Sequence, residues 1–313
     1  MAQYFLKRVI MAVPVMLFVA VFVFLLLRLA PGDPALMIAG ELATPEQLAA
    51  IRRNLGLDGS LTSQFFTWMG NLLKGDFGIS LISNQPVLTL IAQRLEPTLA
   101  LTLVTMVITI IIAVPLGVFA AWRHGGLTDR AVMIISVIGF SIPVFVIGYV
   151  LISIFAVNLK LFPVQGYRPL AGGFLPFIER LILPGLALAS IFIALVSRMT
   201  RGSMLEVLRE DYVRTARAKG LSEWLVLFRH ALRNAAIPIL TVIGGSFAML
   251  ISGVVVTESV FNIPGLGRLV IDAVLARDYP VIQAIILLTS GVYVVINLLI
   301  DLSYALTDPR IRY

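Results

Sequence analysis

The sequence predicts an all-α protein that crosses a membrane six times. Of its 313 residues, 59% are hydrophobic and only 13% are charged, a balance outside the range of soluble globular domains. Six spans are placed on charge-free runs of 17 or more residues, and about 20 apolar helical residues are needed to cross the hydrocarbon core of a bilayer. The runs are Val9–Leu27, Pro97–Trp122, Ala131–Leu159, Leu181–Ser197, Asn234–Thr257 and Tyr279–Ile300.

The distribution of basic residues gives the orientation of the spans. With both termini in the cytoplasm, the inside segments carry 14 Lys and Arg against 7 acids, and the outside segments carry 10 of each kind. This agrees with the positive-inside rule. The formal net charge of +7 is then explained by topology and contact with anionic lipid, and we expect no nucleic-acid partner. The chain has no cysteine, which excludes disulfides and thiolate metal sites.

The first span and the loop that follows it form the N-terminal part of the chain. Val9–Leu27 follows two basic residues, as a signal peptide would, but it is longer than a signal's apolar core and has no small-residue cleavage site, so we interpret it as a retained span. We divide the chain into residues 1–29 with the first span, an extracytoplasmic loop at 30–96, and a core of five spans at 97–313, which includes the polar cytoplasmic segment at 198–238.

The extracytoplasmic loop is predicted to be structured. It opens with a turn at Pro31-Gly32-Asp33-Pro34, and Thr44-Pro45-Glu46-Gln47 is a capping box that begins a helix ending at Gly56. Leu61, Phe65, Trp68, Met69, Leu72 and Leu73 share one face of a helix that ends at Gly75. That helix lies in the outer interface or packs over the outer mouth of the spans. A further amphipathic helix is predicted from Pro86 to about Leu95.

The third span contains residues that weaken a helix, in the stretch Gly139-Phe-Ser-Ile-Pro-Val-Phe-Val-Ile-Gly148. Such residues are common where membrane helices pack closely. The alternative is that this stretch lines a path through the protein. The candidate pathway residues are Phe140, Ser141, Pro143 and Phe145, together with Ser246 and Ser252 of the fifth span.

The segment 198–238 is the polar exception among the spans, with eight basic and four acidic residues. It is predicted to form two short helices hinged at Gly220. The first begins at about Ser203 and shows Met204, Leu208 and Tyr212 on one face, and the second is N-capped by Ser222. A basic helical pair between membrane spans is expected to contact another protein or the lipid surface.

Several kinds of site are missing from the sequence. Asp301 and Glu258 are the main ionisable candidates near span ends, and we interpret both as rim or packing residues rather than parts of an ion pathway. The two histidines, His124 and His230, are far apart, and neither a His-Glu-x-x-His pattern nor a phosphate-binding glycine loop occurs. A transporter of this kind would need another subunit to drive it.

The central segment resembles the "EAA" loop of ABC importer permeases. Arg214-Thr215-Ala216 stand at the Glu-Ala-Ala positions and Gly220 at the glycine, whereas the usual Leu-Pro is replaced by Leu232-Arg233, with a proline only at Pro238. The resemblance implies that this loop contacts an ATPase subunit. The implied contact residues are Asp211, Arg214, Thr215, Ala216, Ala218, Lys219, Gly220 and Leu221.

Over nearly its whole length the chain is similar to the first-permease type of the dipeptide/oligopeptide/nickel branch, which includes dipeptide and glutathione permeases. The matching blocks are Pro31–Pro34, Gly75-Asp76-Phe77-Gly78, Thr215–Gly220, Pro264-Gly265-Leu266-Gly267 and Asp308-Pro309-Arg310-Ile311. The similarity implies an ABC type I importer permease in a bacterial cytoplasmic membrane, without catalysis or cofactor of its own. Its implied partners are a second homologous permease, two ATP-binding subunits or one fused pair that bind ATP and Mg, and an extracytoplasmic solute-binding protein.

Peptides are the expected substrate, and three alternatives remain. A nickel or metal-chelate importer of the same family would share every motif above. An ion-coupled secondary transporter is disfavoured because the spans contain no charged relay. A membrane-embedded enzyme is disfavoured because metal ligands and a nucleophile constellation are missing from the sequence.

Overall fold

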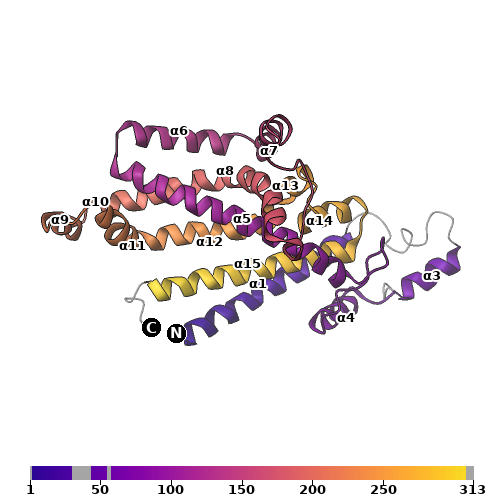
Figure 1. Ribbon diagram of the computed structural model, residues 1–313. Coiled ribbons are helices and arrows are strands. Elements are labelled where there is room, and N and C mark those ends of the chain that lie inside the picture. Colours follow the sequence, from indigo (N-terminus) through magenta and orange to yellow (C-terminus); the bar gives the residue numbers. More distant parts are fainter. Residues whose placement is uncertain (1, 30–43, 55–57, 308–313) are drawn as a thin grey trace. The chain divides into compact units, whose positions relative to one another are not determined.

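The computed structural model describes residues 2–29, 44–54 and 58–307. These residues are mainly helical, with one isolated β-bridge between Ile79 and Pro86 (Figure 1). The motif Pro31–Pro34, the predicted helix end at Gly56 and the C-terminal block Asp308–Ile311 lie outside the described residues.

The membrane-crossing helices agree with the sequence prediction. Four helices are long and apolar enough to span a bilayer: α1 (Ala2–Leu29), α5 (Val87–Trp122), α8 (Phe174–Val207) and α15 (Tyr279–Thr307). Two bent pairs bring the total to six if each pair counts as one span. The first pair joins α6 (Leu127–Ser141) to α7 (Val144–Leu151) and η1 (Ile152–Asn158), and the second joins the stretch Glu223–Asn234 to α12 (Ala236–Gly253).

The third span is bent by 101° between α6 and α7. Pro143 lacks a backbone N–H and its ring disfavours helical geometry at the preceding residue. Ile142 accordingly has extended backbone angles, with φ −85° and ψ 126°. Pro143 then stands at the N-cap position of α7, so the proline that weakens the predicted span becomes the start of a new helix.

The second span begins earlier than predicted. The amphipathic helix expected at Pro86–Leu95 is not separate, because α5 continues from Val87 through Pro97 and Pro115 to Trp122. The sequence suggested a break at Glu96-Pro97. In the structure the Glu96 carboxylate accepts hydrogen bonds from the Tyr167 hydroxyl (2.9 Å) and the Leu170 N–H (3.1 Å), which accommodates the charge beside the helix.

The first of two compact units is built mainly from Arg94–Leu269. Its central helix is α8, which contacts α6, α7 and α12 (Figure 1). Gly185 and Gly117 allow α5 to approach α8 closely, since a Cβ at Gly117 would lie 2.5 Å from the Cβ of Thr200. The largest buried cluster joins these helices: Ala100, Leu101, Met106, Ile152, Ala156, Leu181, Leu183, Ala187, Leu188, Phe192, Leu250, Val254, Phe261 and Ile263.

Two acids near span ends make packing contacts, as predicted. Asp301 forms an ion pair with Arg8 at 3.0 Å. Glu258, in the short helix α13 (Val255–Val260), is fully buried. Its carboxylate accepts from the Thr98 hydroxyl at 2.6 Å and from the Arg268 N–H at 3.0 Å, at the start of α14 (Leu266–Leu275).

The second compact unit is built from Val9–Gln93 and Val270–Gly291. Its helices α3 (Pro45–Asn54) and α4 (Leu61–Leu73) confirm the two helices predicted in the outer loop. The aromatic face of α4 packs on α1, with Phe24 5.3 Å from Phe65 and 5.6 Å from Trp68 between ring centroids. The buried Asp278 holds the turn after α4, accepting from the Ser80 hydroxyl (2.5 Å) and the Leu81 N–H (3.1 Å).

Candidate functional site

The polar segment at 198–238 forms a small helical module at one end of the first unit. Helix α8 runs to Val207, and a three-residue turn leads into α9 (Asp211–Ala218). Figure 1 shows α9 beyond the ends of α8 and α12. The predicted start of the first helix at Ser203 is therefore wrong, because Ser203 and Met204 are buried residues of α8.

Helix α9 has one buried and one exposed side. Val213 and Ala216 are buried and cluster with Val226 of the returning helix. The remaining predicted contact residues are exposed: Asp211, Arg214, Thr215, Ala218, Lys219, Gly220 and Leu221. Seven of the eight predicted contact residues are therefore exposed to solvent. The eighth, Ala216, belongs to the small apolar cluster on which α9 packs.

The hinge at Gly220 is a Schellman turn. The Gly220 N–H donates to the Arg217 carbonyl (2.9 Å) and the Leu221 N–H to the Ala216 carbonyl (3.4 Å), the pair of bonds that defines this helix ending. Gly220 has φ +78°, a conformation that favours glycine. The sequence prediction of a hinge at this residue is confirmed.

The returning helix runs through α10 (Glu223–Leu225), the π-helical stretch η3 (Val226–Ala231) and α11 (Leu232–Asn234). Ser222 holds the N-cap position with extended backbone angles, but its side chain makes no capping hydrogen bond. Leu227 and Ala231 are buried against Val118 and Met204. This packing joins the helical module to the ends of α5 and α8. The charge pattern of the sequence predicts that these ends lie on the cytoplasmic side.

Two side-chain contacts fix α9 to the returning helix. Across the Gly220 turn, Arg217 donates from Nε to one oxygen of Glu223 (2.9 Å) and from Nη2 to the other (3.3 Å). At the other end of α9, the Tyr212 hydroxyl accepts from the Asn234 amide at 2.9 Å. Partial burial raises the pKa of Tyr212, which keeps the hydroxyl neutral. The module is therefore closed by contacts at both ends of α9.

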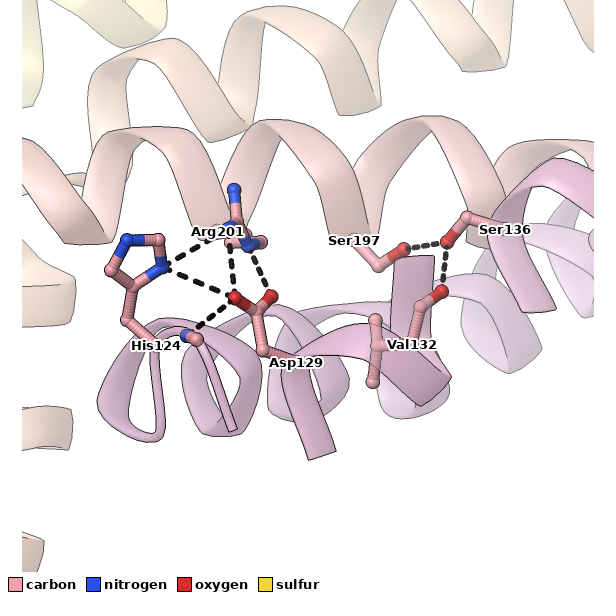
Figure 2. A network of polar contacts seen from close by, with 7 residues as sticks. His124, Asp129, Val132, Ser136, Ser197 and Arg201 are labelled. Atoms are coloured by element: carbon pink, nitrogen blue, oxygen red, sulfur yellow. Dashed lines mark hydrogen bonds and ion pairs between the residues drawn. The ribbon is translucent and has the colours of Figure 1, made fainter. Parts of the chain in front are cut away.

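A second polar network lies where α6 begins beside α8 (Figure 2). The Asp129 carboxylate accepts from Arg201 Nε (2.5 Å) and Nη2 (2.8 Å), and from the Gly125 N–H (3.0 Å). The Nδ1 atom of His124 lies 3.1 Å from both Asp129 Oδ2 and Arg201 Nη2. Sequence reasoning missed this network, because Arg201 was one cation among eight and the only signal was Asp129, the single acid between the second and third predicted spans.

The predicted pathway residues differ in exposure in this chain. Phe140, Ser141, Pro143 and Phe145, around the α6–α7 bend, are all exposed on its surface. Ser246 is buried in α12, with its hydroxyl bonded to the Val242 carbonyl at 2.7 Å. Ser252 also belongs to α12, and its side chain lies outside the described set. Within the described residues, no group of three or more His, Asp or Glu is placed to hold a metal ion.

Comparisons with known proteins cover the whole chain. Residues 113–313 match the family described as "Binding-protein-dependent transport system inner membrane component", and residues 1–102 match its N-terminal companion. The chain is 55% identical over all 313 residues to the "Probable peptide ABC transporter permease protein y4tP" of Sinorhizobium fredii, with both chains fully covered. It is 45% identical to the "Glutathione transport system permease protein GsiC" of Escherichia coli (strain K12), again over the full length of both.

A solved structure shows the same fold. A chain of the MetNI methionine ABC transporter, in an inward-facing conformation, superposes with a TM-score of 0.60 at 18% identity. The match covers 71% of this chain and 97% of that one.

Proposed function

We propose a function from one established premise: this chain belongs to the family of binding-protein-dependent transport system inner membrane components. It is a membrane-spanning transport subunit with the fold of an ABC importer permease. The proposal is that it forms half of the translocation pathway of an ATP-driven peptide importer in the cytoplasmic membrane, with both termini in the cytoplasm. A second, homologous permease forms the other half, and a solute-binding protein delivers substrate from outside.

The observation that carries the proposal is helix α9. It rests on a small apolar base, and its outer side carries Asp211, Arg214, Thr215 and Lys219 in solvent. This mixture of acid and base fits the groove of a protein partner better than an anionic lipid surface, which attracts cations alone. The partner in the proposal is an ATPase subunit that binds ATP and Mg, and each of two such subunits holds one α9-type helix.

The geometry supports a mechanical role for α9. Its connection to α8 is a turn of three residues, and α8 is the most buried of the four long candidate spans. A displacement of α9 by a moving ATPase therefore reaches the centre of the first unit without passing through a flexible linker. The spans then rock between inward-open and outward-open arrangements, and the chain itself performs no covalent chemistry.

Peptides are the substrate class that the comparisons favour. Relatives named as peptide permeases are 45–55% identical to this chain over its full length, and one named for glutathione, itself a tripeptide, is 45% identical. Within the same family, a metal chelate is the competing cargo, and the experiment below distinguishes the two.

The test is reconstitution. The chain is purified from its native membrane in mild detergent, and the proteins that accompany it are identified by mass spectrometry. The complex is then placed in liposomes with its solute-binding protein, and uptake of labelled dipeptides, of glutathione and of nickel is measured with and without ATP. ATP-dependent peptide uptake is the expected result. A chain that purifies alone and transports only under an ion gradient would overturn the proposal.

The Gly220→Val variant tests the role of the α9 turn. A Cβ at Gly220 meets nothing within 4 Å, so the harm is confined to the backbone at φ +78°. The variant is expected to insert normally and to lose uptake. Gly75→Val is the matched control, since Gly75 has φ +83°, an equally open position and the same pair of Schellman hydrogen bonds at the end of α4. Normal uptake by Gly220→Val would remove α9 from the mechanism.

A further inference from the structure

Helices α6 and α8 run antiparallel and are joined at three successive levels. At one end Asp129 binds Arg201 through two hydrogen bonds (Figure 2). Further along, the hydroxyls of Ser136 and Ser197 lie 3.1 Å apart, and Ser136 also donates to the Val132 carbonyl. Beyond them, Gly139 approaches the backbone of α8, since an added Cβ would lie 3.1 Å from the Ser190 carbonyl oxygen.

The three levels differ in strength and in position. The ion pair is charge-assisted, bidentate and largely withdrawn from solvent, with side-chain exposures of 6% for Asp129 and 21% for Arg201. Such pairs are among the strongest polar contacts in proteins. Removing one partner leaves the other charge without compensation in a poorly solvated place. The hydroxyl and glycine levels contribute close packing but little resistance to sliding or separation.

The ion pair stands where movement of α9 would enter the membrane part. Arg201 is in the last turns of α8, which ends at Val207, directly before the turn into α9. Asp129 is in the first turn of α6. The other end of α6 is the 101° bend into α7, which is where a rigid α6–α8 pair would end and a hinge would begin.

We propose that the Asp129–Arg201 pair is the positioning contact that makes α6 move together with α8 when α9 is displaced. His124 and the Gly125 N–H hold the carboxylate from the other side, so the α5–α6 turn moves with the pair. The inference rests on the proposed function, because it assigns a role in transmitting the movement of an ATPase partner. Without the pair, α8 would still move, but α6 and the bend beyond it would lag.

The first experiment compares Asp129→Asn and Arg201→Lys with the wild-type complex in liposomes. Membrane insertion, co-purification of the ATPase subunits, ATP hydrolysis stimulated by the binding protein, and uptake are all measured. Asp129→Asn is expected to assemble and hydrolyse ATP while uptake per ATP falls roughly tenfold, within the usual range of coupling energies. Arg201→Lys keeps the charge and is expected to lie between. Glu206→Gln is the matched control, because Glu206 is an exposed acid of α8 and the variant makes the same change from carboxylate to amide.

The second experiment measures whether the two helices move as a pair. The chain has no cysteine, so Leu127→Cys and Gly202→Cys are its only thiols, and spin labels there report the α6–α8 distance; the complex without these two substitutions, treated with the same label, gives the background from partner subunits. Both positions tolerate a label, since Leu127 is 85% exposed and a Cβ at Gly202 meets nothing within 4 Å. The distance is expected to be the same with ADP and with trapped ATP in the wild type, and to gain a second population in Asp129→Asn.

The outcomes separate this inference from the function on which it rests. If the wild-type complex shows no ATP-driven uptake, both fail. If the wild type couples uptake to ATP and Asp129→Asn couples equally well, only the positioning role is overturned. A wild-type α6–α8 distance that changes with nucleotide would also overturn the positioning role. So would variants Asp129→Asn and Arg201→Lys that lose assembly, hydrolysis and uptake in parallel while their α6–α8 distance distribution stays unchanged.

Discussion

Arg217 and Glu223 face each other across the Gly220 turn, and the guanidinium donates to both oxygens of the carboxylate, at 2.9 and 3.3 Å. The pair joins the last turn of α9 to the first residue of α10. Both side chains remain about two-fifths exposed, at 39% and 43%. The contact therefore orients the turn more than it stabilises it, since exposed pairs contribute roughly 0.2–1 kcal/mol.

A double-mutant cycle on this pair is expected to give a small, salt-sensitive coupling. Arg217→Gln, Glu223→Gln and the double variant are compared by thermal unfolding of the purified complex. The non-additive part of the stability change should be about 0.5 kcal/mol at low salt and should shrink as the ionic strength rises. A coupling above about 2 kcal/mol that salt leaves unchanged would show that the pair is buried by a partner in the complex.

Replacing Gly220 by asparagine rather than alanine should preserve more uptake. Both substitutions add a Cβ that meets nothing, so they differ in how well each residue tolerates positive φ. Asparagine adopts the left-handed region several times more often than most residues, whereas alanine there costs about 1 kcal/mol. Uptake per ATP hydrolysed is the measurement. Uptake by the alanine variant that equals or exceeds that of the asparagine variant would contradict a limit set by the positive φ of this turn.

The sequence was informative about element type and weak about which side of a helix faces inward. The apolar runs, the helix start after Thr44 and the glycine hinge all depend on local chemistry. The structure has four long apolar helices and two bent pairs, α3 begins at Pro45, and Gly220 has a positive φ. The start of the first short helix was misplaced because Ser203 and Met204 continue the periodic pattern of α8 into the polar segment. A charge-rich segment therefore does not mark the end of a membrane helix.

Only part of the candidate site could be predicted from the sequence, for a related reason. Lipid-facing and core-facing positions of a membrane span are nearly equally apolar, so Phe140 and Phe145, which are exposed, could not be distinguished from buried phenylalanines. The Asp129–Arg201 pair joins residues 72 positions apart. A single sequence contains no sign of a contact across that separation, whereas the Arg217–Glu223 pair lies within one predicted turn.

Gly117→Ala should destabilise the first unit, whereas Gly202→Ala should stabilise it slightly. A Cβ at Gly117 would lie 2.5 Å from the Thr200 Cβ and 2.7 Å from the Ser197 carbonyl oxygen, so α5 and α8 would have to separate. At Gly202 an added Cβ meets nothing, and alanine in a helix interior is favoured over glycine by roughly 0.5–1 kcal/mol. Thermal unfolding of both variants in detergent is the measurement, and a similar shift in both would contradict the close α5–α8 crossing.

Thr105→Val is expected to raise stability, and Thr98→Val to lower it. Thr102, Thr105 and Thr109 are fully buried on α5, and within the described part of the chain their hydroxyls have no hydrogen-bond partner. Removing such a hydroxyl relieves a desolvation penalty of about 1–3 kcal/mol. The Thr98 hydroxyl instead donates to Glu258 (2.6 Å) and accepts from the Leu266 N–H (2.8 Å). Thermal unfolding midpoints that move in the same direction for both variants would contradict this assignment.

Glu258 should make the stability of the first unit depend on pH. It lies in α13, outside the candidate spans, and burial raises its pKa above the ordinary value of 4.5, although the Thr98 hydroxyl and the Arg268 N–H oppose the shift. A carboxyl that holds its proton more tightly when folded stabilises the protein fully below the unfolded pKa. This stabilisation is lost as the pH rises from about 4.5 through the folded pKa.

The measurement is the thermal midpoint of the purified complex between pH 4.5 and 8 for wild type, Glu258→Gln and the exposed-site control Glu206→Gln. Glu258→Gln keeps a neutral side chain of the same shape at every pH, so its midpoint should fall less than that of wild type across this range. The Glu258 carboxylate lies directly against Gly265, and a Cβ added at Gly265 would overlap the carboxylate. A wild-type midpoint that rises with pH, or a Glu258→Gln curve parallel to that of Glu206→Gln, would show that the buried carboxylate stays charged and is compensated by its hydrogen bonds.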